Sequence, residues 1–353
     1  MQHAAPPSLA STPIAPHAWA PGAVVSASFS DIDEQAAALT GWNQSYLQIS
    51  AGRFHGVVQR LQFDGIGLFV EELQQAVHQT GHVQPQVVAL GVPALLEGDS
   101  RFCGETSHAG ALHVFSGRGG FEFRSPQRHV MIGIEVDGAL FEAQVLDGSA
   151  HAADRFTISA RLQSLDPTAL TELRQFLLAL FEQAARNEDR LATQPAPCGV
   201  MAAAATRMRD ELLDRLAAAV APSAGAAAHG ATTAHAPHAR LADRARELVA
   251  ARLEEPPTVA ELCALLGVSR RTLQTCFQTT WGMGPLAWLN MLRLNAVRRH
   301  LKTAPTVTEA ATALGFWHFG HFSRDYQALF GELPSHTLQR QRGVAACAGA
   351  RPH

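Results

Sequence analysis

Near the C-terminus, apolar and polar positions follow one pattern twice, in residues 258–285 and again in residues 306–334. Each copy starts with a threonine three residues before a glutamate, which is the spacing of a helix-capping box. A short apolar run and then a glycine follow, and glycine suits the left-handed residue that ends a helix. Each copy therefore predicts a short helix that ends at Gly267 or at Gly315.

A second helix is predicted after each glycine, because an apolar stripe at helical spacing follows it. The stripe consists of Leu273, Phe277 and Trp281 in the first copy, and of Phe322, Tyr326 and Phe330 in the second. It starts six residues after the first glycine and seven after the second, so the second turn is one residue longer. Two helices joined by such a turn have the geometry of the DNA-reading helix-turn-helix motif. One copy can be scaffold, but two copies at a fixed spacing suit the repeating groove of a duplex.

Residues 285–302, between the two copies, predict one connecting helix whose apolar residues lie mostly on one side. At about 1.5 Å per residue this helix spans about 27 Å. Successive major grooves on one face of a duplex lie roughly 34 Å apart. The connector is therefore long enough to hold the two second helices in adjacent grooves.

The segment from Arg293 to Ser335 contains R-L-N-A-V-R-R-H-L, E-A-A-T-A-L-G-F and H-F-S-R-D-Y-Q-A-L-F-G-E-L-P-S. In these runs the chain resembles the DNA-binding domain of AraC/XylS-type transcription regulators. The resemblance covers Leu241 to about Arg342 and implies two helix-turn-helix units on either side of a long joining helix. The run G-F-W-H-F-G-H-F-S-R-D-Y is most similar to the subgroup that includes the ethanolamine-utilisation regulator.

The two second helices are expected to read DNA with the side chains opposite their apolar stripes. In the first copy these are Arg270, Arg271, Gln274 and Thr275; in the second they are His318, Phe319, Gly320, Ser323 and Arg324. Arginine forms a fork of hydrogen bonds with guanine, and glutamine pairs with adenine. The resemblance implies base contact at all of these positions except Arg270 and His318. Arg270 can read a base, touch a phosphate or remain solvated, and the sequence leaves these alternatives open.

Phe319 and Gly320 depart from the polar residue types that make hydrogen-bonded readout. Phe319 can touch a thymine methyl group or pack on Trp317, and the sequence leaves both open. The second unit is therefore expected to depend more on Arg324 and on phosphates. Further phosphate contacts are expected along the connector from Arg298, Arg299 and Lys302. Arg293, on the same helix, suits a packed structural role equally well.

Ahead of the duplicated unit, short apolar runs separated by Gly, Pro, Asp and Ser predict many strands in a compact β-barrel or sandwich. The resemblance implies a cupin-like effector domain at this place. Residues 31–39 predict a short helix capped by Asp31. Residues 166–190 and 201–220 predict an amphipathic helical arm. That arm packs on the β domain, forms a dimer contact, or does both.

The predicted fold class is therefore α+β, with a β-rich effector domain and an all-α DNA-binding domain. The expected boundaries are a disordered start at 1–22, the effector and dimerisation domain at 23–220, a flexible linker at 221–239, the DNA-binding domain at 240–342 and a tail at 343–353. Because a flexible linker transmits force poorly, the two domains are expected to communicate through proximity or dimer spacing.

Charge agrees with this division. Residues 240–342 carry 13 Arg or Lys against 8 Asp or Glu, whereas residues 1–239 carry 14 against 23. A cationic domain joined to an anionic one fits a nucleic-acid reader attached to something else. Five scattered cysteines without C-x-x-C spacing favour a reducing cytosol over a disulfide framework. No apolar run approaches the length of a membrane span.

The sequence thus favours a cytoplasmic transcription regulator that is not an enzyme and needs no metal or cofactor. Its expected partners are double-stranded DNA, RNA polymerase, an unknown small-molecule effector and a second copy of the chain. One alternative is a cupin-type metal-dependent enzyme with an appended DNA-binding domain. His108 and His113 lie near Glu105, but a metal needs three or four convergent ligands, and the chain has no H-x-H pair. Another alternative is a scaffold whose helix pairs bind protein.

Overall fold

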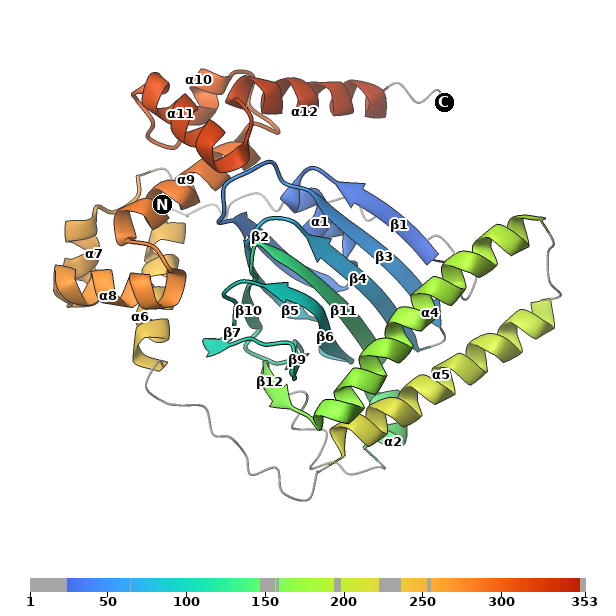
Figure 1. The fold of residues 1–353 in the computed structure, drawn as a ribbon. Helices are drawn as coiled ribbons and strands as arrows, with labels where there is room; N and C mark the ends of the chain where they lie inside the picture. The colour runs from blue at the N-terminus through green and yellow to red at the C-terminus, as the bar shows by residue number, and fades with distance from the viewer. Residues whose placement is uncertain are drawn as a thin grey trace, which may run out of the picture.

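The computed structural model of the chain describes residues 24–63, 65–146, 156, 159–193, 198–221, 236–252 and 255–349. The start at 1–22 and most of the linker at 221–239, both predicted from the sequence, lie outside these residues. The described part forms a β-rich N-terminal domain and a helical C-terminal domain (Figure 1). The predicted α+β class is therefore confirmed.

Two antiparallel sheets build the N-terminal domain. The larger has the strand order β1 (Val24–Phe29), β3 (Gly56–Phe63), β4 (Ile66–Leu73), β11 (Arg128–Asp137), β6 (Val87–Glu97), β9 (Ala111–Val114) and β12 (Arg161–Ser164). The smaller has the order β2 (Trp42–Gln48), β5 (Val77–Val83), β10 (Phe121–Arg124), β7 (Arg101–Phe102) and β8 (Glu105–Thr106). Alternate residues of both sheets point to a shared aromatic core that includes Trp42, Phe69, Phe115 and Phe123.

Helices cover the other face of the larger sheet (Figure 1). The long pair is α4 (Pro167–Thr193) and α5 (Cys198–Val220), and α2 (Gly138–Gln144) packs beside them. Their apolar stripes, which include Leu177 and Leu216, share one core with the sheet residues Ile132 and Ile134. The predicted arm therefore packs on the β domain. The short helix α1 (Ile32–Ala38) begins at its predicted cap, Asp31, whose carboxylate accepts from the N–H groups of the first turn.

The C-terminal domain consists of α6 (Ala236–Ala250), α7 (Val259–Leu266), α8 (Arg270–Trp281), α9 (Pro285–His300), α10 (Val307–Thr312), α11 (Phe319–Phe330) and α12 (Pro334–Gly349). One apolar core surrounds Phe277 and Trp288, a second surrounds Phe322 and Tyr326, and α9 contributes to both. The last helix continues to Gly349, past the predicted boundary at residue 342. The reason is local, because residues 344–348 are mostly alanine, which has the highest helix propensity.

No helix within the described residues has both the length and the apolar character that crossing a bilayer requires.

Candidate nucleic-acid interface

The first unit, α7 and α8, is held by the caps that its sequence predicts. Thr258 Oγ1 accepts from the N–H of Glu261 at 3.2 Å, and Glu261 Oε2 accepts from the N–H of Thr258 at 2.7 Å. Gly267 ends α7 with a left-handed φ of 66°. Ser269 then caps α8 by accepting from the N–H of Thr272 at 3.1 Å. These local bonds fix the direction in which α8 leaves the turn.

The predicted stripe of α8 faces inward, since Leu273, Phe277 and Trp281 are all buried. The four side chains predicted to read DNA are exposed on the other side: Arg270, Arg271, Gln274 and Thr275. Neither arginine has a hydrogen-bond or ion-pair partner among the described residues. Their guanidinium donors are therefore available to an external acceptor.

The second unit, α10 and α11, repeats this arrangement. Thr306 caps α10 by accepting from the N–H of Glu309 at 3.1 Å. The stripe of α11 is buried, and the hydroxyl of Tyr326 donates to Thr337 Oγ1 at 2.9 Å. The predicted readers His318, Phe319, Gly320 and Arg324 are exposed, and Ser323 is half-buried. Unlike Arg270 and Arg271 of α8, Arg324 has partners within its own helix: Nη2 lies 2.8 Å from His321 Nδ1 and Nε lies 3.7 Å from Asp325.

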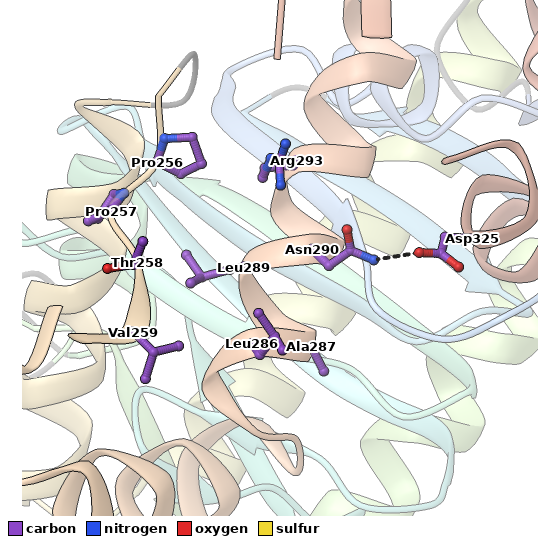
Figure 2. Close-up of a pocket in the computed structure, with 10 residues that line it drawn as sticks. All are labelled: Pro256, Pro257, Thr258, Val259, Leu286, Ala287, Leu289, Asn290, Arg293 and Asp325. Carbon is purple, nitrogen blue, oxygen red and sulfur yellow. Dashed lines mark hydrogen bonds between the residues drawn. The ribbon is translucent and has the colours of Figure 1, made fainter. Parts of the chain in front are cut away.

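The connector α9 fixes the two units relative to each other. Arg293 donates from Nε and Nη2 to the carbonyl of Leu314 at 3.1 and 2.9 Å, and its guanidinium lies over the ring of Phe316. Asn290 donates to Asp325 of α11 at 3.4 Å. A hollow of about 570 Å³ lies beside these residues. Figure 2 shows the side chains that line it, which come from α9, the start of α7 and α11. Arg293 is therefore a packed structural arginine.

Arg298, Arg299 and Lys302, predicted to contact phosphates, instead face the N-terminal domain. Arg298 is only 3% exposed, with Nη1 donating to Glu332 at 3.1 Å and Nη2 to the carbonyl of Ser30 at 3.3 Å. In this arrangement of the domains, its predicted role as a phosphate contact is excluded by burial.

The other two cations of α9 are held by the acidic start of α1. Arg299 Nε donates to Asp33 at 3.0 Å, and Lys302 Nζ donates to Asp31 at 2.6 Å and to Asp33 at 2.8 Å. Burial acts to raise the pKa of Asp33, but Arg299 and Lys302 outweigh it and hold this pKa below its ordinary value. Phosphate contact by Arg299 and Lys302 therefore requires these ion pairs to break.

Backbone contacts extend the same junction to β2 and the loop that follows it. Asn295 of α9 accepts from the N–H of Gln48 at 3.0 Å and donates to the carbonyl of Gln48 at 3.0 Å. The side chain of Gln48 and the N–H of Gly52 both donate to the carbonyl of Leu329 at 3.0 Å. The domains therefore touch directly as well as being joined by the linker, and communication through proximity or dimer spacing stays a prediction.

A second junction joins β5 and β10 to α6 and α8. The ring of His78 packs edge-on to Trp281, with centroids 4.5 Å apart, and His78 Nε2 lies 2.9 Å from Glu122. Arg124 donates to the carbonyl of Trp281 at 3.3 Å. Asp243 of α6 hydrogen-bonds Glu122, and burial together with that neighbouring carboxylate raises the pKa of Asp243 to about 6. No sequence signal pointed to the contacts between the two domains, because their partners lie more than a hundred residues apart in the chain.

The histidines of the metal-enzyme alternative do not converge. His113 is buried, with Nε2 2.7 Å from the hydroxyl of Ser107, and burial lowers its pKa to about 3. His108 is exposed. Among the described residues, no three His, Cys, Asp or Glu side chains are grouped as metal ligands would be.

The interior between the two sheets contains a buried carboxylate. Glu71 accepts from the hydroxyl of Tyr46 at 2.8 Å, from Gln35 at 3.1 Å and from Gln79 at 3.3 Å. The space beside it has a volume of only about 10 Å³, which is about the room that one water molecule needs. A larger ligand at this place would require the sheets to move apart.

Comparison with known proteins identifies relatives of the C-terminal residues. A family model of a helix-turn-helix domain, HTH_18, matches residues 262–340. The chain is 38% identical over 93 residues to a probable thc operon regulatory protein of Rhodococcus erythropolis, which covers 25% of this chain and 28% of that protein. It is 32% identical over 104 residues to XylDLEGF operon transcriptional activator 3 of Pseudomonas putida, which covers 28% of this chain and 31% of that protein.

Among solved structures, the chain is similar to a probable AraC family transcriptional regulator from Rhodopseudomonas palustris. The two are 39% identical over 29% of this chain and 97% of that chain, with a TM-score of 0.28. The chain spans less than a third of the length of the curated relatives named above. The residues that the family model matches all lie within the C-terminal domain.

Proposed function

We propose that this chain, whose residues 262–340 are a helix-turn-helix domain of the AraC/XylS type, is a sequence-specific DNA-binding regulator of transcription. Its partner is double-stranded DNA, with α8 and α11 in successive major grooves. One observation carries the proposal. The two helices have equal length and matching buried stripes, and both expose their first turns from one helical domain.

The proposed roles follow from position on each helix. Base edges are read by Arg271, Gln274 and Thr275 in the first unit, and by Phe319, Gly320, Ser323 and Arg324 in the second. Arg270 and His318 stand at the start of each helix and reach toward phosphates. Arg299 and Lys302 add phosphate contacts only when the acidic residues of α1 release them, and Arg298 would in addition have to leave Glu332.

The N-terminal domain is proposed to sense a small molecule and to change the availability of the DNA-binding domain. The contact of α9 with α1 and β2 supports this, because any movement of these elements alters the partners of α9. Two relatives of the C-terminal domain are described as an operon regulator and a transcriptional activator. By analogy we propose an activator that works in the cytoplasm with RNA polymerase, possesses no catalytic activity and pairs with a second copy.

Selection from a pool of random duplexes by the full-length chain tests the proposal. The expected product is a site with two half-sites about one helical turn, roughly 34 Å, apart. The paired variant Arg270→Ala/Arg271→Ala should lose the preference in one half-site and keep it in the other. Recovery of unselected sequence at low salt would contradict the proposal and favour a helix pair that binds protein.

A further inference from the structure

The two reading helices have opposite chemistry at their first turns. Both are 12 residues long, and both place their first buried stripe residue at the fourth position. This alignment puts Arg270 opposite Phe319 and Arg271 opposite Gly320. Where the first unit offers two unpaired guanidinium groups, the second offers an aromatic ring and a bare backbone.

Two aromatic side chains are exposed at the start of α11. Trp317 is 71% exposed and Phe319 is 41% exposed, whereas most aromatic rings of this domain are buried in its two cores. No ring of the described residues stacks on either of them. The alternative that Phe319 simply packs on Trp317 therefore fails, and two large apolar surfaces remain open to a partner.

Gly320 is not required by the packing of the protein. Its φ lies outside the left-handed region, and a Cβ atom added to it would meet nothing within 4 Å. Glycine is a weak helix former, so the fold alone would favour alanine here. A glycine with open space in front of it lets another surface approach the backbone closely.

Polar readout by the second unit is limited. The guanidinium of Arg324 is shared with His321 and Asp325, and Ser323 is half-buried. The apolar group that a duplex presents in its major groove is the C5-methyl of thymine. Trp317 and Phe319 lie at the N-terminal end of α11, and Arg270 and Arg271 lie at the same end of α8. This correspondence favours DNA over a protein as the partner of the two aromatic rings.

We propose that the second unit recognises thymine by apolar contact. Trp317 and Phe319 lie against thymine methyl groups in the major groove, and Gly320 lets the start of α11 approach the bases. The inference rests on the proposed function, because it requires α11 to enter a groove. It adds that the two half-sites are read by different chemistry, through hydrogen bonds in one and methyl contacts in the other.

Replacement of single thymines by deoxyuridine in the selected duplex tests this directly, since it removes only the methyl group. We expect each critical replacement to weaken binding about threefold to fivefold, the size that burial of one methyl group implies. These positions should fall in the half-site that Arg271→Ala leaves unchanged. Full tolerance of deoxyuridine in that half-site would overturn the inference while leaving the proposed function intact.

Variants of the protein give the second half of the test. Trp317→Ala and Phe319→Ala should bind thymine and deoxyuridine duplexes equally, because the methyl group has lost its partner. Gly320→Ala should raise the melting temperature and yet weaken DNA binding at least fivefold. Leu286→Ala is the matched control, since Leu286 is 73% exposed and belongs to α9, outside both reading helices.

Two outcomes separate the hypotheses. The inference is wrong if Trp317→Ala and Phe319→Ala leave the affinity for both duplexes unchanged. It is also wrong if they weaken binding to both by the same factor, so that the preference for thymine over deoxyuridine remains. If the chain selects no sequence at all, the proposed function itself fails.

Discussion

Arg271 is exposed near the start of α8, and the described residues offer it no ion pair. A planar guanidinium in this state keeps all five N–H donors for an external acceptor. The backbone that carries Arg271 is held in place, because Ser269 caps the first turn of α8 and Leu273, two residues further on, is buried in the core. A free donor on a fixed support is suited to discrimination between bases.

Arg271→Ala is expected to cost about 1–3 kcal/mol of binding free energy on the selected duplex and to relax one base position. Arg271→Lys keeps the charge but loses the fork. It should therefore retain affinity for unrelated DNA while losing the preference. Competition binding with single-base variants of the duplex measures both. An equal loss on every duplex would mean that Arg271 touches only phosphate.

Asp243 provides a second prediction at this scale. Burial and the nearby Glu122 raise its pKa from an ordinary 3.8 to about 6, while Arg246 and His78 also face the pair. The folded chain therefore binds more protons than the unfolded chain between these values, and this carboxyl's contribution to stability falls as pH rises through that window. Asp243→Asn should be more stable than the parent above pH 6, with a smaller difference near pH 4.

Chemical denaturation at several pH values between 4 and 8 checks this expectation. Asp210→Asn, which makes the same substitution at an exposed carboxyl on α5, serves as the control. A constant difference between Asp243→Asn and the parent would show that the carboxyl pair is not the cause.

Among the elements, α9 has the most varied surroundings. One side packs in the cores of both reading units, and the other covers the outer edge of β2, which is the first strand of the smaller sheet. At this edge Gln48 has no neighbouring strand to pair with. The side chain of Asn295 accepts from the N–H of Gln48 and donates to the carbonyl of Gln48, so it makes the two hydrogen bonds that a strand would have made. Covering a strand edge in this way also prevents pairing with another chain.

Asn295→Ala is expected to lower the free energy of unfolding by about 1–3 kcal/mol, because it leaves two buried backbone groups of Gln48 without partners. Asn290→Ala is a matched control on the same helix, since its only described side-chain contact is the long one to Asp325. Denaturant titration of both variants measures the difference. A similar small loss in both would mean that water replaces Asn295 at the edge.

Elements of the C-terminal domain could be predicted because their signals are local. The capping box at Thr258, the glycine at 267 and the stripe of α8 all lie within one short window. The partners of Arg299 and Lys302 could not be predicted, since Asp33 is more than 260 residues away. The periodicity of the connector does not distinguish a cation that contacts DNA from one that contacts a carboxylate. The β domain could be predicted only as a class, because strand order depends on pairings between distant residues.

Across the whole molecule, the acidic start of α1 occupies cations that a polyanion would otherwise attract. Asp33→Asn is expected to loosen this contact, because it removes the carboxylate that Arg299 and Lys302 share and leaves Lys302 with Asp31 alone. If both then reach phosphates, the slope of log affinity against log salt should steepen by about 1–2. Glu97→Gln, which breaks an exposed ion pair within the N-terminal domain, should leave the slope unchanged.

Binding measured across a range of salt concentrations distinguishes the cases. An unchanged slope in Asp33→Asn would contradict phosphate contact by Arg299 and favour ion pairs that serve only to join the domains.

The turn before α11 is one residue longer than the turn before α8, since α11 begins four residues after Gly315 and α8 begins three after Gly267. If α8 and α11 enter adjacent grooves as proposed, their differing first turns prevent the two units from exchanging places on a duplex. A single chain can thus sit on its site in one orientation only, and its N-terminal domain always projects toward the same flank. Inverting the site relative to a start of transcription would turn that domain toward a different set of neighbours.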